Sequence, residues 1–489
     1  MTTTMPELST VDVVMVVVPF PAQGHLNQLL HFCHFVCSYD IPVHFIGSIT
    51  HNRQVRSRLH GWNPVAFPNL QFHDFPIPAY AVPPPDPHSS IKFPSHLQPA
   101  FDAALLHLRP HLSLLIKSLS GITTRVIVVH DSLMSFAANL SADLSNVESY
   151  AFHSVSAFAT LLFQWESRGI MMEQSMKICP NVPVVSSDGC FTSDFVEFVK
   201  RQHKLTAAGN GRIINTCRPI EAKFIDLFAK EPNLQNKPLF AIGPLNPVTL
   251  EEHDKVEDVN LNLVPRKRHE CLRWLDKQPE SSVIYISFGT TSTLCCRQIN
   301  ELSAGLDRSQ MKFLWVPREA DKGDIFEGEC FSSSVSEDEA TNKKSSAVST
   351  LATKGKGIVL RGWAPQLEIL GHPAVGCFMT HCGWNSCIES MSFGVPMAAW
   401  PLHSEQPRCA VLVTEILRVG IPVRDWGRRD EIVTAENIES VIKRLMLSSE
   451  GNEVRSRAKS LGSSIRQATF DGGDSKKEFE SFISHICRP

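Results

Sequence analysis

Short runs of apolar residues recur along the chain, and each run is followed by a stretch in which apolar positions repeat at helical spacing. The runs are continuously apolar rather than alternating, which is typical of parallel strands covered on both faces of a sheet. They occupy residues 13–19, 43–46, 126–130, 212–215, 283–288, 313–316, 358–360 and 374–379. This pattern predicts an α/β fold with two doubly wound parallel sheets.

A change in composition divides the pattern into two parts. Residues 246–268 are polar, charged and interrupted by proline, which is typical of a linker between domains. The apolar segment FAIGPL at residues 240–245 comes just before it. We therefore predict an N-terminal domain of residues 1–245 and a C-terminal domain of residues 269–464.

Composition and charge narrow the classes of function. Of the 489 residues, 43% are hydrophobic and 20% are charged, as expected for a soluble globular protein with two cores. The net charge of −3 gives no electrostatic reason to expect nucleic acid or an anionic membrane as partner. The 14 cysteines have no repeating spacing, which favours reduced thiols in a cytoplasmic protein. The apolar run at 13–20 is far shorter than the roughly 20 residues of a membrane-spanning helix, so we expect no signal peptide or membrane anchor.

Residues 363–406 hold the densest set of candidate binding groups. The apolar run at 374–379 leads through THCGWNS into an amphipathic stretch, and such a strand, glycine turn and helix start can bind a pyrophosphate through free backbone N–H groups. His381, Asn385 and Ser386 can add side-chain donors. Glu389 lies one turn beyond Asn385 on the same helix face, where ribose hydroxyls would lie, and Trp363 offers a flat ring for uracil.

Each of these residues also has a simpler interpretation. Asn385 or Ser386 could cap the helix, Glu389 could be a solvated surface charge, and Trp363 could belong to the core. The ordered set that ends in the polar cluster 404–406 favours a sugar nucleotide instead. A metal site is not expected, because no second His/Cys pair stands at ligand spacing and no Asp-x-Asp motif occurs.

The first strand-to-helix turn carries the candidate general base. The run at 13–19 leads into FPAQGH, which places His25 at a helix N-terminus, where the helix dipole favours a neutral imidazole able to accept a proton. Asp131 directly follows the buried run 126–130, and the carboxyl ends of parallel strands converge on the ligand crevice. His25 could instead be a capping or core residue, and Asp131 could cap a helix at 132–140. A hydride-transferring Rossmann enzyme is disfavoured, because this turn lacks Gly-x-Gly-x-x-Gly.

The segment WAPQLEILGHPAVGCFMTHCGWNSCIESMSFGVPMAAWPLHSEQ at 363–406 resembles the signature box of plant UDP-dependent glycosyltransferases, and FPAQGH resembles the family's first turn. The resemblance implies the GT-B architecture, with two Rossmann-like domains facing a cleft and residues 465–489, including a final helix at about 474–487, joined to the N-terminal domain. It implies that His25 is the catalytic base and Asp131 its partner. The family's donor-binding residues then correspond to Gly289, Thr290, Thr291, Trp363, Ala364, Gln366, His381, Trp384, Asn385, Ser386, Glu389, Glu405 and Gln406.

In the same family pattern, Trp363, Ala364, Gln366 and Glu389 address uracil and ribose. The diphosphate lies on His381, Asn385 and Ser386 with the turn at 289–291, and the sugar on Trp384, Glu405 and Gln406. Gln406 implies glucose as the donor sugar, with xylose open. No cofactor beyond the co-substrate UDP-glucose is implied, and the chain is expected to act as a monomer on a small hydroxylated acceptor.

The acceptor follows from a narrower resemblance. Residues 130–166, 318–326 and 405–420 look like the zeatin (cytokinin) O-glucosyltransferase branch of the family, which implies inverting transfer of glucose to a zeatin-type hydroxyl. A flavonoid or other phenol is the alternative acceptor, and a catalytically silent UDP-sugar or hormone binder is the alternative class. We expect acceptor-pocket walls at 76–87 and 151–172. Residues 327–354, rich in Ser, Glu and Lys, depart from that branch and predict a flexible loop.

Overall fold

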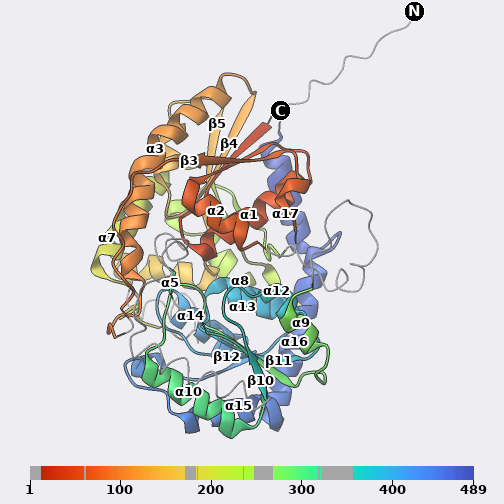
Figure 1. Cartoon of the computed structure of the whole chain (residues 1–489). Coiled ribbons are helices and arrows are strands. Elements are labelled where there is room, and N and C mark those ends of the chain that lie inside the picture. The colour runs from red at the N-terminus through yellow and green to blue at the C-terminus, as the bar shows by residue number, and fades with distance from the viewer. Residues whose placement is uncertain are drawn as a thin grey trace, which may run out of the picture.

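The computed structural model describes residues 13–59, 62–86, 88–170, 183, 185–234, 236–246, 268–317, 320–321 and 356–488. Most of the predicted linker and the predicted loop at 327–354 lie outside these residues. Two parallel sheets form two lobes, stacked one above the other in Figure 1. The predicted α/β class with two parallel sheets is therefore confirmed.

The N-terminal sheet has the strand order β3-β2-β1-β4-β5-β6-β7, and every described pair in it is parallel. Its strands are β1 Val13–Val18, β2 Val43–Ser48, β3 Leu70–Phe75, β4 Arg125–Asp131, β5 Val147–His153, β6 Gly211–Ile214 and β7 Leu239–Ala241. The helices of this lobe are α1 Gln23–Cys37, α2 Ile49–Ser57, α3 Gln98–Ser120, α4 Phe136–Ser141, α5 Ala157–Ser167, α7 Ser193–Leu205 and α8 Arg218–Ala229, with short 3-10 turns at Pro64–Ala66, Ser95–Leu97, Thr206–Ala208 and Pro232–Leu234.

The C-terminal sheet has the order β10-β9-β8-β11-β12-β13, again parallel. Its strands are β8 Val283–Ser287, β9 Lys312–Val316, β10 Gly357–Val359, β11 Val375–Thr380, β12 Met397–Ala399 and β13 Gly420–Pro422. Its helices are α9 Glu270–Leu275, α10 Cys296–Ser309, α12 Gln366–Leu370, α13 Trp384–Phe393, α14 Gln406–Val411, a π-helix at Leu412–Ile416, a 3-10 turn at Trp426–Arg428, α15 Ala435–Leu447 and α16 Ser449–Thr469. The last helix of the chain is α17 Asp474–Ile486.

The apolar runs form strands because both faces of each sheet are covered. Along β1, Met15 and Val17 belong to one buried cluster with residues of α1, whereas Val14 and Val16 belong to another with residues of α3. β8 divides its side chains between two clusters in the same way. A strand that alternates between two dry faces has no polar side, which explains the continuous apolar pattern.

The C-terminus returns to the first lobe. Helix α17 lies beside α1 in the upper lobe of Figure 1, and its Phe482 ring is 5.9 Å from that of Phe32 and 5.2 Å from that of Phe240. A further cluster of buried residues spans both lobes, since Phe158 and Phe224 of the N-terminal lobe share it with Trp384 and Cys409. The two lobes therefore have apolar contacts with each other as well as their own cores.

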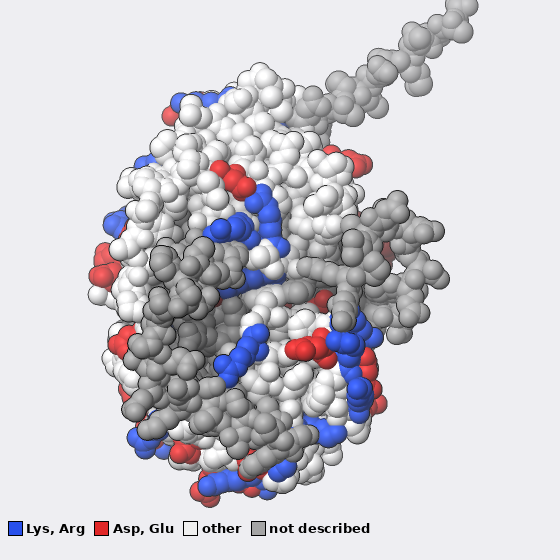
Figure 2. Space-filling model, viewed as in Figure 1, with Lys and Arg blue, Asp and Glu red and all other residues white. Residues whose placement is uncertain are grey.

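Lys, Arg, Asp and Glu side chains are interspersed on the face shown in Figure 2, outside the area covered in grey. Within the described part of the chain, none of the helices combines the length and apolar character needed to span a bilayer. The cysteines that the structure describes are free thiols, and most are buried.

Candidate active site

One cavity of about 580 Å³ opens between the two lobes, at the carboxyl ends of both sheets. Fourteen of the fifteen residues expected in the site from sequence line it; these are His25, Gly289, Thr290, Thr291, Trp363, Ala364, Gln366, His381, Trp384, Asn385, Ser386, Glu389, Glu405 and Gln406. The fifteenth, Asp131, lies behind His25 and is fully buried. The structure thus brings together residues from opposite ends of the chain.

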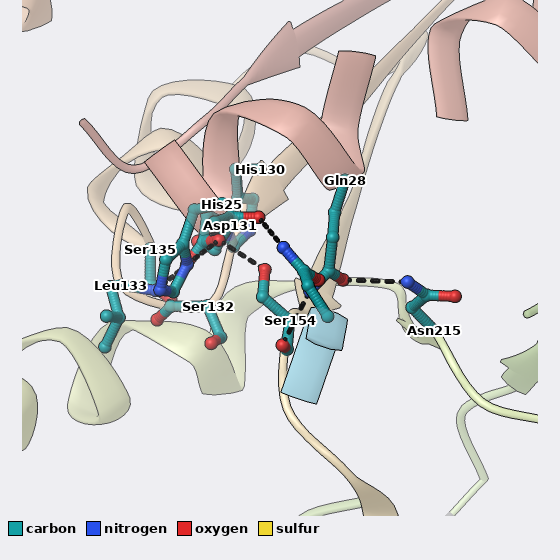
Figure 3. Close-up of polar contacts among 11 residues, drawn as sticks. His25, Gln28, His130, Asp131, Ser132, Leu133, Ser135, Ser154 and Asn215 are labelled. Atoms are coloured by element: carbon teal, nitrogen blue, oxygen red, sulfur yellow. Dashed lines mark hydrogen bonds and ion pairs between the residues drawn. The ribbon is translucent and has the colours of Figure 1, made fainter. Parts of the chain in front are cut away.

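His25 and Asp131 form a hydrogen-bonded pair at the N-terminal wall of the cavity (Figure 3). The His25 Nδ1 atom is 2.7 Å from Asp131 Oδ2. The same carboxylate oxygen accepts a hydrogen bond from Ser154 Oγ at 2.9 Å, and the other oxygen accepts one from the Leu133 backbone N–H at 2.9 Å. Because α4 begins only at Phe136, Asp131 does not cap a helix at 132–140. Its carboxylate orients the imidazole and leaves Nε2 of His25 as the nitrogen available to a substrate.

The electrostatics of His25 differ from the expectation based on the helix dipole. Burial lowers the pKa of the imidazole, but the charge and hydrogen bond of Asp131 and the charge of Glu405 outweigh it, so the pKa of His25 is raised above 6.5. The prediction of a pKa that favours the neutral ring is therefore wrong in direction. Two carboxylates nearby stabilise the imidazolium more than burial destabilises it.

The opposite wall of the cavity begins with a small hydrogen-bonded group around Gln366. Its Nε2 donates to Glu389 Oε2 at 2.7 Å and to Ser386 Oγ at 3.3 Å, while its Oε1 accepts from Tyr285 Oη at 3.0 Å. Burial raises the pKa of Glu389 to about 7. Glu389 is therefore part of the cavity wall rather than a solvated surface charge.

The strand-to-helix turn after β11 has the geometry of an anion site. Helix α13 starts at Trp384 after Gly383, and this N-cap residue has no side chain to bind the N–H groups of the first turn. The His381 ring is enclosed by two glycines, because a Cβ on Gly289 or Gly383 would come within 2.6 or 2.7 Å of its Nε2. Gly289 also has a φ of +76°, which disfavours any other residue. Burial lowers the pKa of His381 to about 4, so the ring is neutral and can donate one N–H.

Glu405 and Gln406 lie beside this turn. Glu405 Oε1 accepts a hydrogen bond from the Trp384 backbone N–H at 3.1 Å, and Gln406 Oε1 accepts from the backbone N–H groups of Leu402 and His403 at 2.9 and 3.0 Å. Burial raises the pKa of Glu405. The loop that carries both residues is thereby fixed against the start of α13.

The chain is similar to known proteins over nearly its whole length. Residues 11–247 match the family model of the glycosyltransferase N-terminal domain, and residues 248–417 match that of UDP-glucuronosyl and UDP-glucosyl transferases. The chain is 45% identical to zeatin O-glucosyltransferase of Phaseolus lunatus, covering 97% of both chains. It is 43% identical to zeatin O-xylosyltransferase of Phaseolus vulgaris, covering 97% of this chain and 98% of the other.

The chain belongs to the plant UDP-glycosyltransferase family. A solved member of the family, UGT71G1 of Medicago truncatula complexed with UDP-glucose, superimposes with a TM-score of 0.71 at 26% identity, covering 97% of this chain and 98% of that one. The two lobes therefore form the GT-B architecture that the resemblance implied. As a UDP-glycosyltransferase, this protein uses a UDP-sugar as co-substrate.

Four polar residues of this UDP-glycosyltransferase site were not predicted from the sequence: Gln28, Arg58, Ser154 and Asn215. Asn215 directly follows β6, so the strand-end rule that selected Asp131 after β4 also points to it. Ser154 follows β5, a strand that the apolar runs did not predict. Gln28 lies one turn after His25 on the same face of α1. Arg58, over the Trp363 ring at 5.3 Å from its centroid, carries no sequence signal, because it comes from the other lobe.

Proposed function

We propose that this chain transfers glucose from UDP-glucose to a hydroxyl of a zeatin-type cytokinin, with inversion, giving an O-β-glucoside. One observation carries the proposal: the His25–Asp131 pair lies at one wall of the cavity, and the predicted donor residues line the opposite wall. A base and a sugar-nucleotide site that face each other across one cavity are what a direct transfer requires.

In the proposed reaction, Nε2 of His25 takes the proton of the acceptor hydroxyl while that oxygen attacks the anomeric carbon from the face opposite UDP. The bond between the anomeric carbon and the diphosphate oxygen breaks, and UDP leaves with the electron pair. Asp131 holds the Nδ1 proton of His25 and stabilises the imidazolium that forms. The sugar moves in a single displacement, so its anomeric configuration inverts.

The donor is proposed to lie along the C-terminal wall. Trp363, Ala364, Gln366 and Glu389 would hold uracil and ribose, and Trp384, Glu405 and Gln406 the sugar. His381, Asn385, Ser386 and the turn Gly289, Thr290 and Thr291 would hold the diphosphate. Support comes from the first turn of α13, where the N-cap residue Gly383 has no side chain to bind the N–H groups. These groups and the helix dipole suit the charge that UDP gains as it leaves.

The same feature supports transfer without a metal ion. The described residues hold no cluster of three or more His, Cys, Asp or Glu side chains that could bind a metal. The α13 N-terminus and the neutral His381 can donate hydrogen bonds to the diphosphate in place of the charge that a metal ion would supply. Turnover that persists in an excess of EDTA supports this proposal, whereas loss of turnover that Mg²⁺ restores contradicts it.

Two relatives and the walls of the cavity support the choice of acceptor. The relatives described above are named for transfer to zeatin. The acceptor side of the cavity is lined by the aromatic rings of Phe20, Phe93, Phe101, Phe163, Phe191 and Phe195. The lining residues His153 and Gln164 each have a buried polar atom, Nε2 and Oε1, that has no protein partner among the described residues. A flat, nitrogen-rich ring such as a purine fits apolar walls with a few polar atoms.

Product formation tests this function directly. The protein is incubated with UDP-glucose and a panel of zeatin isomers and flavonols, and each mixture is searched by mass spectrometry for the gain of one hexosyl unit. Zeatin glucoside as the best product supports the proposal. A flavonol glucoside as the best product would replace the acceptor but keep the enzyme class.

UDP-xylose is the second candidate donor, because one relative is named a zeatin O-xylosyltransferase. Mixing equal concentrations of UDP-xylose and UDP-glucose with one acceptor lets the two products be counted in a single spectrum. A dominant pentosyl product would overturn glucose as the donor.

Replacing His25 separates an enzyme from a silent binder. His25→Ala should lower turnover by about 10²- to 10⁴-fold while UDP binding persists, because general base catalysis contributes an effect of that size. UDP binding by the wild-type chain without product from any acceptor would instead favour a binding protein.

We also propose domain limits of 1–245 and 269–464, with residues 465–489 joined to the first domain, and a monomeric protein of the cytoplasm. The two sheets and the position of α17 support the limits, and the buried free thiols support a reducing compartment. All the expected site residues come from a single chain, which supports a monomer. Size-exclusion chromatography with light scattering tests the last point.

A further inference from the structure

A chain of side-chain amides joins the two lobes at the wall of the cavity, and Gln28, which lines the cavity, is at its centre (Figure 3). Gln28 is 4% exposed. Its Nε2 donates both to the Ser154 backbone carbonyl at 2.9 Å and to Asn385 Oδ1, and its Oε1 accepts from Asn215 Nδ2 at 3.0 Å. Both N–H groups and one lone pair of this side chain are therefore committed to protein partners.

On the N-terminal side, Gln28 is connected to the catalytic pair through Ser154. The backbone carbonyl of Ser154 accepts from Gln28, and its hydroxyl donates to the same Asp131 oxygen that binds His25. Ser154 itself is 6% exposed. Gln28 thus holds the backbone of Ser154, whose hydroxyl in turn binds the carboxylate that orients His25.

On the C-terminal side, the first turn of α13 is bound to the first turn of α1. Asn385 accepts from Gln28 through Oδ1, and its Nδ2 donates to the carbonyl of Gly24, the residue before His25, at 2.7 Å. Next to it, Trp384 Nε1 donates to the Asn215 backbone carbonyl at 2.7 Å. The helix start that is proposed to hold the diphosphate and the helix start that carries the base therefore belong to one hydrogen-bonded network.

We propose that Gln28 is a positioning residue that sets the separation of His25 from the start of α13. This inference rests on the function proposed above. Direct displacement needs the acceptor oxygen, the anomeric carbon and the leaving oxygen in line. In the proposed reaction the N-terminal lobe holds the acceptor oxygen, and the C-terminal lobe holds the leaving oxygen of UDP. A misplacement of about 1 Å can cost about 10²-fold in rate, so a rigid bridge between the two helix starts acts on the chemical step.

The test replaces Gln28 by methionine, which has a similar volume and no amide. Gln298→Met is the matched control. Gln298 is also buried, at 5% exposed, and its Nε2 and Oε1 atoms form hydrogen bonds with the backbone of Val433. Unlike Gln28, it does not line the cavity. Gln28→Met should lower kcat by roughly 10- to 100-fold with less than about a threefold change in the acceptor KM. Gln298→Met should leave kcat within about twofold of wild type. Equal kcat values for the two variants would overturn the proposal.

A double variant tests whether Gln28 acts through Asn385. Gln28→Met and Asn385→Ala both remove the Gln28–Asn385 hydrogen bond, so the loss in kcat of the combined variant should be smaller than the product of the two single losses. Multiplicative losses in kcat would show that the two side chains act independently and would overturn the proposal.

The bridge can also be measured without turnover. The midpoints of thermal unfolding of the two single variants and the double variant should show coupling, since the second substitution removes a contact already lost. Additive midpoints would overturn the inference even if glucoside is formed normally. A wild-type chain that forms no glucoside, but whose midpoints show the coupling, would overturn the proposed function and leave the bridge standing.

Discussion

At the scale of single residues, the base in this site is tuned by two carboxylates from different lobes. Asp131 binds Nδ1 of His25 directly, and Glu405 acts on the ring by its charge. Both favour the imidazolium, so they strengthen His25 as a base and at the same time reduce the fraction that is neutral at a given pH. The balance between these effects should be visible in the pH dependence of transfer.

The first prediction concerns Glu405→Gln. Transfer needs neutral His25, so kcat/KM falls as the pH drops through the pKa of the imidazole, which lies above 6.5 in the free protein. Removing the Glu405 charge lowers that pKa, so the acid limb of the kcat/KM profile should move to lower pH. Glutamine keeps an oxygen that can accept from the Trp384 N–H. Glu439→Gln, on the surface helix α15, is the control, and identical acid limbs in all three proteins would contradict the prediction.

Glu389 provides a second prediction at this scale. Its pKa of about 7 means that the free protein holds a protonated carboxyl below that pH and a carboxylate above it. The ionised form accepts hydrogen bonds from ribose hydroxyls more strongly. The KM for UDP-glucose should therefore rise as the pH falls through this value, and Glu389→Gln should flatten the dependence. A wild-type donor KM that is constant across this range would rule out the proposed role.

Several site residues could be predicted one by one, but their partners could not. His25 and Asp131 stand at positions that strand-end and helix-start rules select. That Glu405 raises the pKa of His25 depends on how two lobes meet, which no local pattern encodes. The same holds for Asn385, which was expected to bind phosphate and whose amide is in part committed to Gln28 and Gly24 of the other lobe.

At the scale of helices and strands, continuous apolar runs were reliable and alternating ones were not. All eight predicted strands are present, with ends shifted by no more than a few residues. Other strands lie outside those eight runs; β3, for example, was missed because it reads LQFHDF and lies at a sheet edge, with only Leu70 buried. The predicted pocket wall at 151–172 divides between β5 and α5, where Phe163 and Gln164 line the cavity while Leu161 and Leu162 are core.

The helix α17 carries the prediction that belongs to this scale. Phe482 is fully buried among Phe32, Tyr150 and Phe240, so Phe482→Ala should lower the free energy of unfolding by about 3–5 kcal/mol. Phe470 precedes α17 and is 51% exposed, so Phe470→Ala should change it by no more than about 0.5 kcal/mol. Urea unfolding of the three proteins measures both values. Similar losses for the two variants would mean that α17 does not stabilise the N-terminal sheet.

At the scale of the whole molecule, the two lobes are joined on both sides of the donor site. In the wall of the cavity lies the amide network around Gln28. Beside Trp363 lies a two-point ion pair, in which Arg58 Nη1 and Nη2 are 2.5 and 2.7 Å from the carboxylate oxygens of Asp321. Arg58 comes from the end of α2, and Asp321 is bound to the other lobe through the Thr290 carbonyl at 2.7 Å. The side chains are 7% and 9% exposed.

This ion pair supports the last prediction. Asp321→Asn leaves the Arg58 charge buried without its counter-charge, and breaking a buried pair in this way costs about 3–5 kcal/mol. Because the pair lies at one edge of the cleft and apolar contacts join the lobes elsewhere, we expect the cleft to open at this edge while each lobe stays folded. The variant should therefore show a larger radius of gyration by X-ray scattering and a higher KM for UDP-glucose. Arg56→Ala breaks the exposed pair with Asp74 within one lobe and should change neither quantity. An unchanged radius of gyration in Asp321→Asn, together with a lowered unfolding midpoint, would contradict the prediction. It would mean that the ion pair stabilises the fold of a lobe and not the contact between the lobes.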